Sequence, residues 1–593
     1  MSQKITRLFD FAYHQKETYN LSRAFVTKYN GKWEATSSEE FLEKANAMSR
    51  GLLRLGVKPN DKIAVISSTN RTEWNILDVA ILQLGAQNVP IYPTISATDY
   101  EYIFNHAAVT HCFLSDKELF DKALITKEKV SSLKDIYSFD DIEGCKSWKE
   151  VLELGKDTSN QGEVDALKDA VTTDDLATII YTSGTTGLPK GVMLSHKNIL
   201  TNVIACTPRL PVEAGKTIVL SFLPVCHVFE RMLLYLYQYN GISINFAEGI
   251  DKITENIKEV KPHLMSVVPR LLEKVYDSII TKGSELTGVK KLIFFWAVGV
   301  GLRYRPYGTN GWWYETKLRI ADKLIFSKWR AALGGNMSTM VSGSAALQPR
   351  LARVFTAAGM QIMEGYGLTE TSPVVSVNEY ANKGMKIGSV GKVITDVEVK
   401  IAADGEILVK GPNIMMGYFK DPEKTAAVMT GDYFHTGDKG EIDENGFVTI
   451  TGRKKEIFKT SGGKYIAPAL LENSLKQSRF IEQAMVVGEG EKMPAAIIQP
   501  NYEFLREWAR IHHEPLSNNN ADLIMNPHVI ARIQKEVAKA NKRFAKWETI
   551  KRFELTPDVW GIDNGLLTPT MKPKRIKIKA KYIALYNKIY DKD

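Results

Sequence analysis

The sequence predicts an α/β protein in which a large N-terminal domain, built of layered α/β subdomains plus a small antiparallel β subdomain, is followed by a smaller α+β C-terminal domain. Three observations predict this. The chain has 593 residues, which is too many for one hydrophobic core. Short β-rich runs alternate with amphipathic stretches through its first two-thirds. Near residue 390 this texture changes to short alternating strands.

The alternation is clear at KIAVIS (62–67), which is followed by EWNILDVAILQLG (73–85). A short apolar run followed by a stretch with helical periodicity is typical of α/β layers. We therefore expect largely parallel strands in the N-terminal domain.

After residue 390, the runs VEVKI, GEILVKG and GFVTITG are separated by Asp-Gly and Asn-Gly turns, which indicate antiparallel hairpins. Beyond GRKKE (452–456) the chain continues with a Gly-Gly turn, two strand candidates (AMVVG and AAIIQP) and a long polar helical region. We place the domain boundary at residues 453–455, with domains at 1–453 and 454–593.

The composition is that of an ordinary globular protein, with 44% hydrophobic and 24% charged residues. The four cysteines show no C-x-x-C pair and no zinc-type spacing, so we expect reduced, mostly buried thiols. The net charge of +9 is mild for this length. It permits an anionic partner without requiring one, and we expect no nucleic-acid partner.

The N-terminus, MSQKITRLFDFAYHQKE, lacks the apolar core of a signal peptide. The longest apolar run, LIFFWAVGVGL at 292–302, is shorter than the roughly 20 residues needed to cross a bilayer. We expect a cytoplasmic protein that does not span a membrane.

The stretch YTSGTTGLPKGVMLSH (181–196) gathers hydroxyls, glycines and a lysine behind an apolar run. Such groups wrap a polyphosphate, because bare backbone N–H groups can approach it closely. The spacing Gly184, Gly187, Lys190 differs from a Walker A loop. The strand-like run before it and the helix-like NILTNVIA (198–205) after it favour a phosphate loop over a surface turn.

A second polar cluster is EGYGLTET (364–371). Tyr366 offers a flat face for a heterocycle, Thr369 a hydroxyl, and Glu370 a hard oxygen ligand of the kind Mg²⁺ prefers. Taken alone, the octet is more typical of a loop with a capping threonine.

A third cluster combines FHTGDKG (434–440) with TGRKKEIFKTSGGKY (451–465). The carboxylate of Asp438 can accept both hydroxyls of a ribose, and Arg453 can donate to the same sugar or to a phosphate. An Asx turn is the alternative for Asp438.

Two further residues lie in other motifs. His227 in LPVCHVFER has the surroundings of a core histidine, and Lys572 in GLLTPTMKPKR would by itself be a surface charge.

Together, and in this order, these motifs make the sequence resemble the adenylate-forming superfamily of acyl-CoA synthetases, peptide adenylation domains and firefly luciferase. LPVCHVFER, the long insert between VVPRLLEKV and VSGSAAL, and GLLTPTMKPKR resemble its long-chain fatty acyl-CoA synthetase branch. Many relatives have Ser-Gly-Lys or Thr-Gly-Lys where this chain has Thr-Met-Lys, a form that the long-chain branch shares.

The resemblance implies two half-reactions. A fatty carboxylate attacks the α-phosphorus of ATP to give acyl-AMP and pyrophosphate, and the thiol of coenzyme A then displaces AMP. It also implies that the C-terminal domain is mobile and rotates between the steps. Lys572 would serve the first step and the SGGKY loop (461–465) the second, with Lys455 at the hinge.

The resemblance assigns the remaining roles as follows. Lys572, Lys190, Glu370 and His227 are the expected catalytic residues, and Thr182 and Glu370 the expected Mg²⁺ ligands. The expected nucleotide- and coenzyme-binding residues are Thr182, Ser183, Gly184, Thr185, Thr186, Gly187, Lys190, Ser344, Ala345, Glu364, Gly365, Tyr366, Gly367, Thr369, Asp438, Arg453, Lys455, Ser461, Gly462, Gly463 and Lys572.

Two other functions stay open: an enzyme that delivers acyl groups from acyl-AMP to a carrier protein, and a membrane-associated fatty-acid-binding module without turnover. Residues 290–330 hold nine basic residues, two acidic residues and ten aromatics. This mixture suits peripheral contact with an anionic bilayer, although a helical pair packed on the core explains most of the aromatics slightly better. Acyl chain length, oligomeric state and the pathway served do not follow from the sequence.

Overall fold

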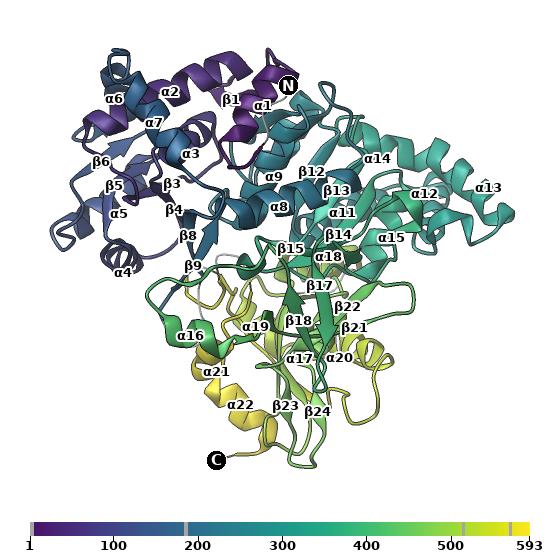
Figure 1. The fold of residues 1–593 in the computed structure, drawn as a ribbon. Helices are drawn as coiled ribbons and strands as arrows, with labels where there is room; N and C mark the ends of the chain where they lie inside the picture. The colour runs from purple at the N-terminus through teal and green to yellow at the C-terminus, as the bar shows by residue number, and fades with distance from the viewer. Residues whose placement is uncertain (1–4, 183–187, 513–515, 562, 569–571, 593) are drawn as a thin grey trace. The chain divides into compact units, whose positions relative to one another are not determined.

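The computed structural model describes residues 5–182, 188–512, 516–561, 563–568 and 572–592 (Figure 1). The chain forms two compact units, each built from separate segments. Unit 1 comprises Met1–Val399, Val409–His435 and Asp443–Val448, and unit 2 comprises Lys400–Leu408, Thr436–Ile442 and Thr449–Asp593. The chain therefore passes repeatedly between the units around residues 400–449.

Unit 1 contains an eight-stranded sheet with the order β19-β9-β8-β4-β3-β5-β6-β7. Its strands from β8 to β7 pair in parallel, whereas β8 and β9 are antiparallel. The strands are β3 (Lys62–Ile66), β4 (Gln87–Ile91), β5 (Val109–Leu114), β6 (Asp135–Ser138), β7 (Lys146–Ser147), β8 (Leu176–Thr182), β9 (Lys190–Ser195) and β19 (Gly417–Tyr418). The parallel strands predicted for this region are confirmed.

A nine-stranded sheet in the same unit has the order β16-β15-β14-β13-β12-β10-β11-β1-β2. Its centre, from β14 to β1, is parallel. The strands are β1 (Phe25–Tyr29), β2 (Lys32–Thr36), β10 (Ile218–Ser221), β11 (Ser243–Phe246), β12 (Leu264–Val267), β13 (Thr339–Ser342), β14 (Gln361–Gly367), β15 (Val374–Val377) and β16 (Lys392–Val393).

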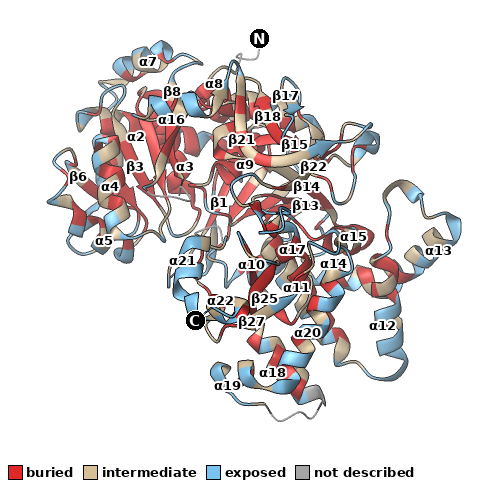
Figure 2. Cartoon of the chain, turned by 90° about the horizontal axis from the view of Figure 1, so that it is seen from below, coloured by how far each residue is buried: buried red, intermediate tan, exposed pale blue. Residues whose placement is uncertain are grey.

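Helices pack around these sheets; most of the central strands are buried, and many outward helix faces are exposed (Figure 2). The first group is α1 (Asp10–Thr18), α2 (Ser38–Arg54), α3 (Thr72–Gln83), α4 (Ala97–Ala107), α5 (Lys117–Lys127), α6 (Trp148–Leu154), α7 (Gln161–Ala170) and α8 (His196–Cys206). The second is α9 (Val228–Tyr239), α10 (Ile253–Val260), α11 (Pro269–Ser284), α12 (Gly288–Gly301), α13 (Trp312–Ala321), α14 (Ser327–Ala332), α15 (Pro349–Ala357) and α16 (Pro422–Ala427).

Local chemistry explains where these helices begin. Ser195 ends β9 and caps α8, because its side chain accepts from the backbone N–H of Asn198, whose side chain in turn accepts from the N–H of Ser195. This reciprocal capping satisfies two N–H groups that the helix leaves unpaired. It also holds the strand that follows the predicted phosphate loop directly against a helix.

A five-stranded sheet with the order β17-β18-β21-β20, with β22 also on β21, occupies the region where the antiparallel subdomain was expected. Its members are β17 (Glu398–Ile401), β18 (Glu406–Lys410), β20 (Met429–Thr430), β21 (Tyr433–Ile442) and β22 (Val448–Arg453). The division between the units runs through several of these strands.

The remainder of unit 2 is α+β, as predicted. A three-stranded sheet, β25 (Ile481–Val487), β26 (Ala495–Pro500) and β27 (Arg552–Leu555), is joined by a two-stranded ribbon of β23 (Phe458–Lys459) and β24 (Tyr465–Ile466). Its helices are α17 (Pro468–Leu475), α18 (Tyr502–His512), α19 (Asn520–Met525), α20 (Pro527–Asn541), α21 (Arg575–Lys581) and α22 (Ile583–Tyr590).

All four cysteines are free thiols, and Cys112, Cys206 and Cys226 are buried, as expected from their spacing. Among the described residues, no helix combines the length and apolar character needed to traverse a bilayer.

Candidate functional site

The two strands that flank the predicted phosphate loop are paired in unit 1. Thr182, the last residue of β8, lies directly opposite Lys190, the first residue of β9. The two strands are antiparallel neighbours. Ser183, Gly184, Thr185, Thr186 and Gly187 lie outside the described residues.

The structure brings Lys190 close to Glu370 through a residue that the sequence did not single out. The phenol of Tyr418 donates to Oε1 of Glu370 at 2.9 Å and accepts from Nζ of Lys190 at 3.3 Å. The lysine ammonium also lies 4.3 Å from the centre of the Tyr418 ring, a favourable cation–π distance. These three side chains are called the Lys190–Tyr418–Glu370 cluster.

Tyr418 reaches this place because β19 pairs with β9, with Tyr418 opposite Val192. The adjacent Gly417 has φ +141°, and a Cβ there would lie 2.9 Å from the side chain of Thr425, so glycine is required next to the tyrosine. Burial, followed by the neighbouring Glu370 carboxylate, raises the pKa of Tyr418 well above its usual value. Its hydroxyl therefore keeps its proton and remains a donor at neutral pH.

The EGYGLTET motif forms the end of β14 and the turn after it. Glu364 is buried, lies opposite Ser342 in the parallel pair β13–β14, and accepts from the backbone N–H of Leu347 at 3.1 Å. Burial raises the pKa of the Glu364 carboxyl to about 8. The predicted nucleotide residues Gly365 and Tyr366 are half-buried, Gly367 is exposed, and Thr369 is buried.

Ser344 and Ala345 follow β13, on the connection that also carries Leu347. Ser344 is half-buried and has φ +68°, a conformation that costs a non-glycine residue free energy. Ala345 is exposed. The ends of β13 and β14 thus place Ser344, Ala345 and the Glu364–Tyr366 segment at one edge of the nine-stranded sheet, the edge at which ligands bind in open α/β sheets.

Asp438 and Arg453 meet in unit 2. Asp438 is buried on β21, and Nε of Arg453, the last residue of β22, donates to its Oδ1 at 2.9 Å. The guanidinium is partly exposed, so the pair presents a charge-assisted donor and acceptor set of the kind that recognises a diol.

The predicted hinge follows directly. Lys455 is exposed in a turn closed by the N–H of Glu456, which donates to the carbonyl of Arg453 at 3.0 Å. Ser461, Gly462 and Gly463 are exposed between β23 and β24. Lys572 is also exposed, and its backbone N–H donates to Oγ1 of Thr568 at 3.0 Å.

His227 caps helix α9, because its Nδ1 accepts from the backbone N–H of Phe229 at 3.2 Å. The next charged residues of this motif are buried in unit 1: Arg231 pairs with Asp78 at 2.6 Å, and Glu230 accepts from Ser221 and Ser266. Separating a buried charge from its partner would destabilise the fold, so the ion pair and these hydrogen bonds hold α9 in place. The VFER part of the motif is thus structural, and it orients His227.

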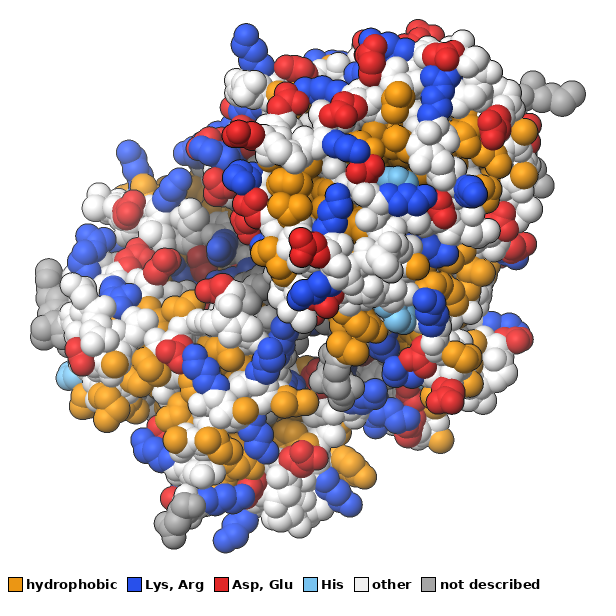
Figure 3. Space-filling view, turned by 90° about the vertical axis from the view of Figure 1, so that its left-hand side faces the viewer, with side chains coloured by type: hydrophobic (Ala, Val, Ile, Leu, Met, Phe, Trp, Pro, Cys, Tyr) orange, Lys and Arg blue, Asp and Glu red, His pale blue; other side chains and the backbone are white. Residues whose placement is uncertain are grey.

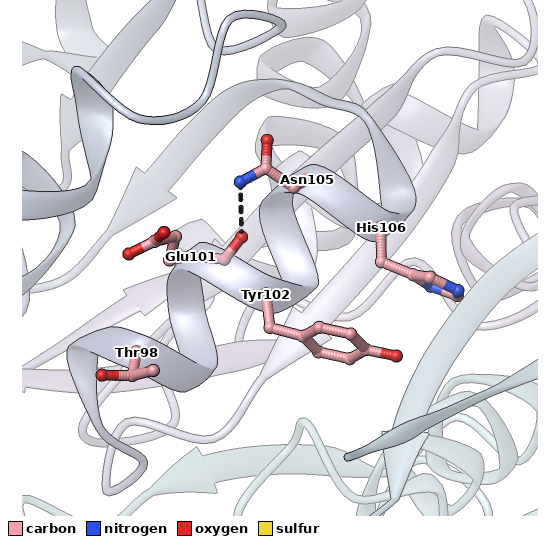
Figure 4. A pocket seen from close by; sticks show the side chains of 5 residues that line it. All are labelled: Thr98, Glu101, Tyr102, Asn105 and His106. Atoms are coloured by element: carbon pink, nitrogen blue, oxygen red, sulfur yellow. Dashed lines mark hydrogen bonds between the residues drawn. The ribbon is translucent and has the colours of Figure 1, made fainter.

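A pocket on α4 is lined by Thr98, Glu101, Tyr102, Asn105 and His106 (Figure 4). Tyr102 stacks on His106 with ring centres 5.4 Å apart, and Nδ1 of His106 lies 2.7 Å from the hydroxyl of Tyr181, the residue before Thr182. Burial lowers the pKa of His106. The pocket contains none of the predicted site residues, and its His106 contacts β8 through Tyr181.

The donor set around Glu370 suits Mg²⁺ delivered with a nucleotide. No group of three or more His, Cys, Asp or Glu side chains able to hold a metal occurs in the described part of the chain. Mg²⁺ is usually held by one or two carboxylates together with substrate phosphates, so a complete protein cage is not required. Glu370 is a carboxylate of the kind that such a site uses, and Lys190 is linked to it through Tyr418.

Over the face shown in Figure 3, basic and acidic side chains are interspersed. This agrees with a net charge of +9 arising from 77 basic and 68 acidic residues. On this face, neither basic nor acidic side chains form an extended patch of one charge.

Comparison with curated proteins shows similarity over almost the whole chain. A long-chain-fatty-acid–CoA ligase of Mycobacterium tuberculosis is 34% identical over 569 residues, which are 95% of this chain and 94% of that protein. Long-chain-fatty-acid–CoA ligase 1 of Cavia porcellus is 32% identical over 594 residues, covering 94% of this chain and 82% of that protein.

Solved structures share the fold. An anthranilate CoA ligase in complex with anthranoyl-AMP has a TM-score of 0.71 at 18% identity and covers 97% of both chains. The A domain of a carboxylic acid reductase from Segniliparus rugosus, in complex with AMP and a carboxylic acid, has a TM-score of 0.74 at 22% identity and covers 100% of this chain and 95% of that one.

Two family models match in succession. The model of the AMP-binding enzyme C-terminal domain matches residues 455–593, and the model of the AMP-binding enzyme itself matches residues 13–419. Since the second match alone spans more than half of the sequence, the chain belongs to the AMP-binding enzyme family.

Proposed function

We propose that the protein is a long-chain fatty acid:CoA ligase that forms acyl-AMP and pyrophosphate from a fatty acid and ATP, and then transfers the acyl group to coenzyme A. The observation that carries this proposal is the similarity to long-chain-fatty-acid–CoA ligases at 30–34% identity over nearly the full chain. The Lys190–Tyr418–Glu370 cluster beside the ends of the phosphate loop supports it chemically.

In the first step, Thr182 and Lys190 hold the β- and γ-phosphates, together with the loop between them. Glu370 and Thr182 would hold Mg²⁺ through their side-chain oxygens, and the ion would supply positive charge beside the phosphates. Tyr366 stacks on adenine, and Ser344 and Ala345 line the nucleotide and acyl pocket. Asp438 accepts hydrogen bonds from the ribose hydroxyls, and Arg453 donates to the same sugar. Such positioning and electrostatic stabilisation are the main contributions an enzyme makes to chemistry at phosphorus.

Lys572 donates to the fatty carboxylate and the α-phosphate while charge accumulates at phosphorus. In the second step the 461–465 loop replaces Lys572 at the reacting groups. The mobile domain begins after residue 453, and Lys455 is its hinge. The exposed position of Lys455 in a turn supports this proposal, because an exposed turn can change φ and ψ without unpacking a core.

We propose in addition that the enzyme acts in the cytoplasm in peripheral contact with an anionic membrane face. A long alkyl chain partitions into lipid at about 0.8 kcal/mol per methylene, so most of its acyl substrate resides in a bilayer.

Incubation with ATP, Mg²⁺ and palmitic acid tests the first step through release of pyrophosphate, and addition of coenzyme A tests the second through the thioester. A panel of acids from short to very long chains, scored by kcat/KM, then defines the substrate. Pyrophosphate release without a thioester would favour delivery to a carrier protein, and fatty-acid binding without pyrophosphate would favour a non-catalytic binding module.

A further inference from the structure

The hairpin formed by α12 and α13 in unit 1 exposes a cluster of large apolar side chains. Leu292 is 72% exposed on α12, and Trp312 and Trp313 at the start of α13 are 66% and 65% exposed. Much of both helices is solvent-facing (Figure 2). The other exposed apolar residues of this region are Val289, Phe295, Trp296, Ile320 and Leu324.

These side chains are not the core-facing side of the hairpin. Phe294, Ala297 and Val298 are buried in the core of unit 1, so α12 already has an apolar face that packs inward. Val289, Leu292 and Trp296 are spaced by three and four residues and form a second apolar face. A helix that is apolar on both faces while one face is exposed indicates a binding surface.

The aromatic residues divide in the same way. Of the ten in residues 290–330, six are buried or half-buried, which accords with the packed helical pair expected from the sequence. The four exposed ones are Phe295, Trp296, Trp312 and Trp313. The rings of Trp312 and Trp313 stack with their centres 4.0 Å apart. Tryptophan is favoured at membrane interfaces because its apolar ring carries one polar N–H.

The charges around this apolar surface are mostly basic. Eight basic side chains are exposed, and none of them forms an ion pair with a described residue: Lys290, Lys291, Arg303, Arg305, Lys317, Arg319, Lys323 and Lys328. Of the two acidic residues in this region, Asp322 pairs with Arg330 at 2.5 Å, and Glu315 is half-buried on α13. The hairpin is thus a positively charged apolar surface within a protein whose overall charge is mild.

We propose that the α12–α13 hairpin is the surface with which this protein docks on an anionic lipid bilayer. Trp312 and Trp313 enter the headgroup region, and the surrounding lysines and arginines bind lipid phosphates. A second copy of the chain is a poorer occupant, because two such hairpins would bring like charges together. This assignment rests on the membrane contact proposed above and not on the ligase reaction.

The test is flotation of the full-length chain with vesicles of phosphatidylcholine alone, and of phosphatidylcholine with phosphatidylglycerol at a ratio of about 3:1. We expect binding only to the anionic vesicles, weakened when salt is raised from about 0.1 M to about 1 M, because screening shortens the Debye length from about 10 Å to about 3 Å. The double variant Trp312→Ser, Trp313→Ser should lose most of this binding.

A second variant, Lys317→Glu with Arg319→Glu, should lose binding through charge alone. The matched control is Leu124→Ser with Ile125→Ser, which removes an exposed apolar pair from α5 and should leave vesicle binding intact. Unchanged melting temperatures would establish that the variants fold.

Equal binding to neutral and anionic vesicles, or full binding by the double tryptophan variant, would overturn the proposal. Conversion of a dimer to a monomer by that variant, with vesicle binding unchanged, would identify a protein interface instead. Turnover of a water-soluble acid should be unaffected in the tryptophan variant. If the protein bound anionic vesicles through the hairpin but made no acyl-CoA, the ligase function would be refuted and the docking surface would stand.

Discussion

The hydroxyl of Tyr418 donates to the carboxylate of Glu370 across 2.9 Å, although 48 residues separate them in the sequence. The same hydroxyl accepts from Lys190, so one phenol joins a predicted metal ligand to a predicted phosphate-binding cation. Tyr418 thereby orients both groups, and we regard it as a positioning residue.

Tyr418→Phe should weaken the use of Mg²⁺ by the enzyme. The variant keeps the ring beneath Lys190 but removes the donor to Glu370, and a hydrogen bond to a charged group contributes about 1.5–3 kcal/mol. We expect roughly a tenfold or greater rise in the Mg²⁺ concentration needed for half-maximal pyrophosphate release, since 1.4 kcal/mol corresponds to a factor of ten. Tyr418→Leu, which also loses the cation–π contact, should in addition raise KM for ATP. Identical Mg²⁺ dependence in wild type and Tyr418→Phe would contradict a positioning role.

Glu370→Gln should impair catalysis with Mg²⁺-ATP far more than it impairs folding. The amide keeps the shape and an acceptor for Tyr418 but lacks the charge that a hard cation requires. Initial rates at limiting Mg²⁺, together with the melting temperature, distinguish the two effects. Unchanged kinetics at limiting Mg²⁺ would place the metal ligand elsewhere.

Lys572→Ala should abolish formation of acyl-AMP and leave thioester formation from supplied acyl-AMP comparatively intact. The exposed side chain belongs to the terminal loop that is proposed to serve one half-reaction only. The two half-reactions are measured separately, by pyrophosphate release and by consumption of synthetic acyl-AMP. Equal losses in both would rule out this division of labour. Lys574→Ala, two residues along the same loop, is the matched control.

Lys455→Pro tests the hinge. Proline would fix φ near −65° and favour one domain arrangement, so the overall rate should fall steeply while stability changes little. An ordinary exposed linker position would tolerate the change. Adenylation and thioester formation are measured one at a time. Near-normal rates in both would exclude a moving hinge at this residue, and Lys455→Ala should behave like wild type.

The buried Glu364 predicts a pH dependence of stability. Its pKa in the folded protein is raised to about 8, above the ordinary value near 4.3, so the folded state retains a proton that the unfolded chain releases. Its stabilising contribution is therefore complete at acidic pH and is lost as pH rises through about 8. Glu364→Gln should remove this component, making the decline in the urea midpoint between pH 5 and pH 8 shallower than in wild type. Parallel pH profiles for both proteins would show that the carboxyl is ionised when folded.

The sequence by itself determined the local structure of this protein. The apolar runs before and after the predicted phosphate loop form β8 and α8, and KIAVIS and the stretch after it form β3 and α3. Periodicity and capping act within one element, so both can be read from neighbouring residues. The order of the polar motifs likewise sufficed to indicate the AMP-binding family.

Only the tertiary structure decided which distant side chains meet. Tyr418 joins Lys190 and Glu370 because β19 pairs with β9, and Arg453 meets Asp438 through neighbouring strands of one sheet. Nothing in the sequence around MMGYFKDP marks its tyrosine, because strand pairing depends on the packing of the whole sheet. The same holds for the aromatics of α12 and α13: their composition was evident from the sequence, but packing against the core of unit 1 decided which were buried and left Trp312 and Trp313 exposed.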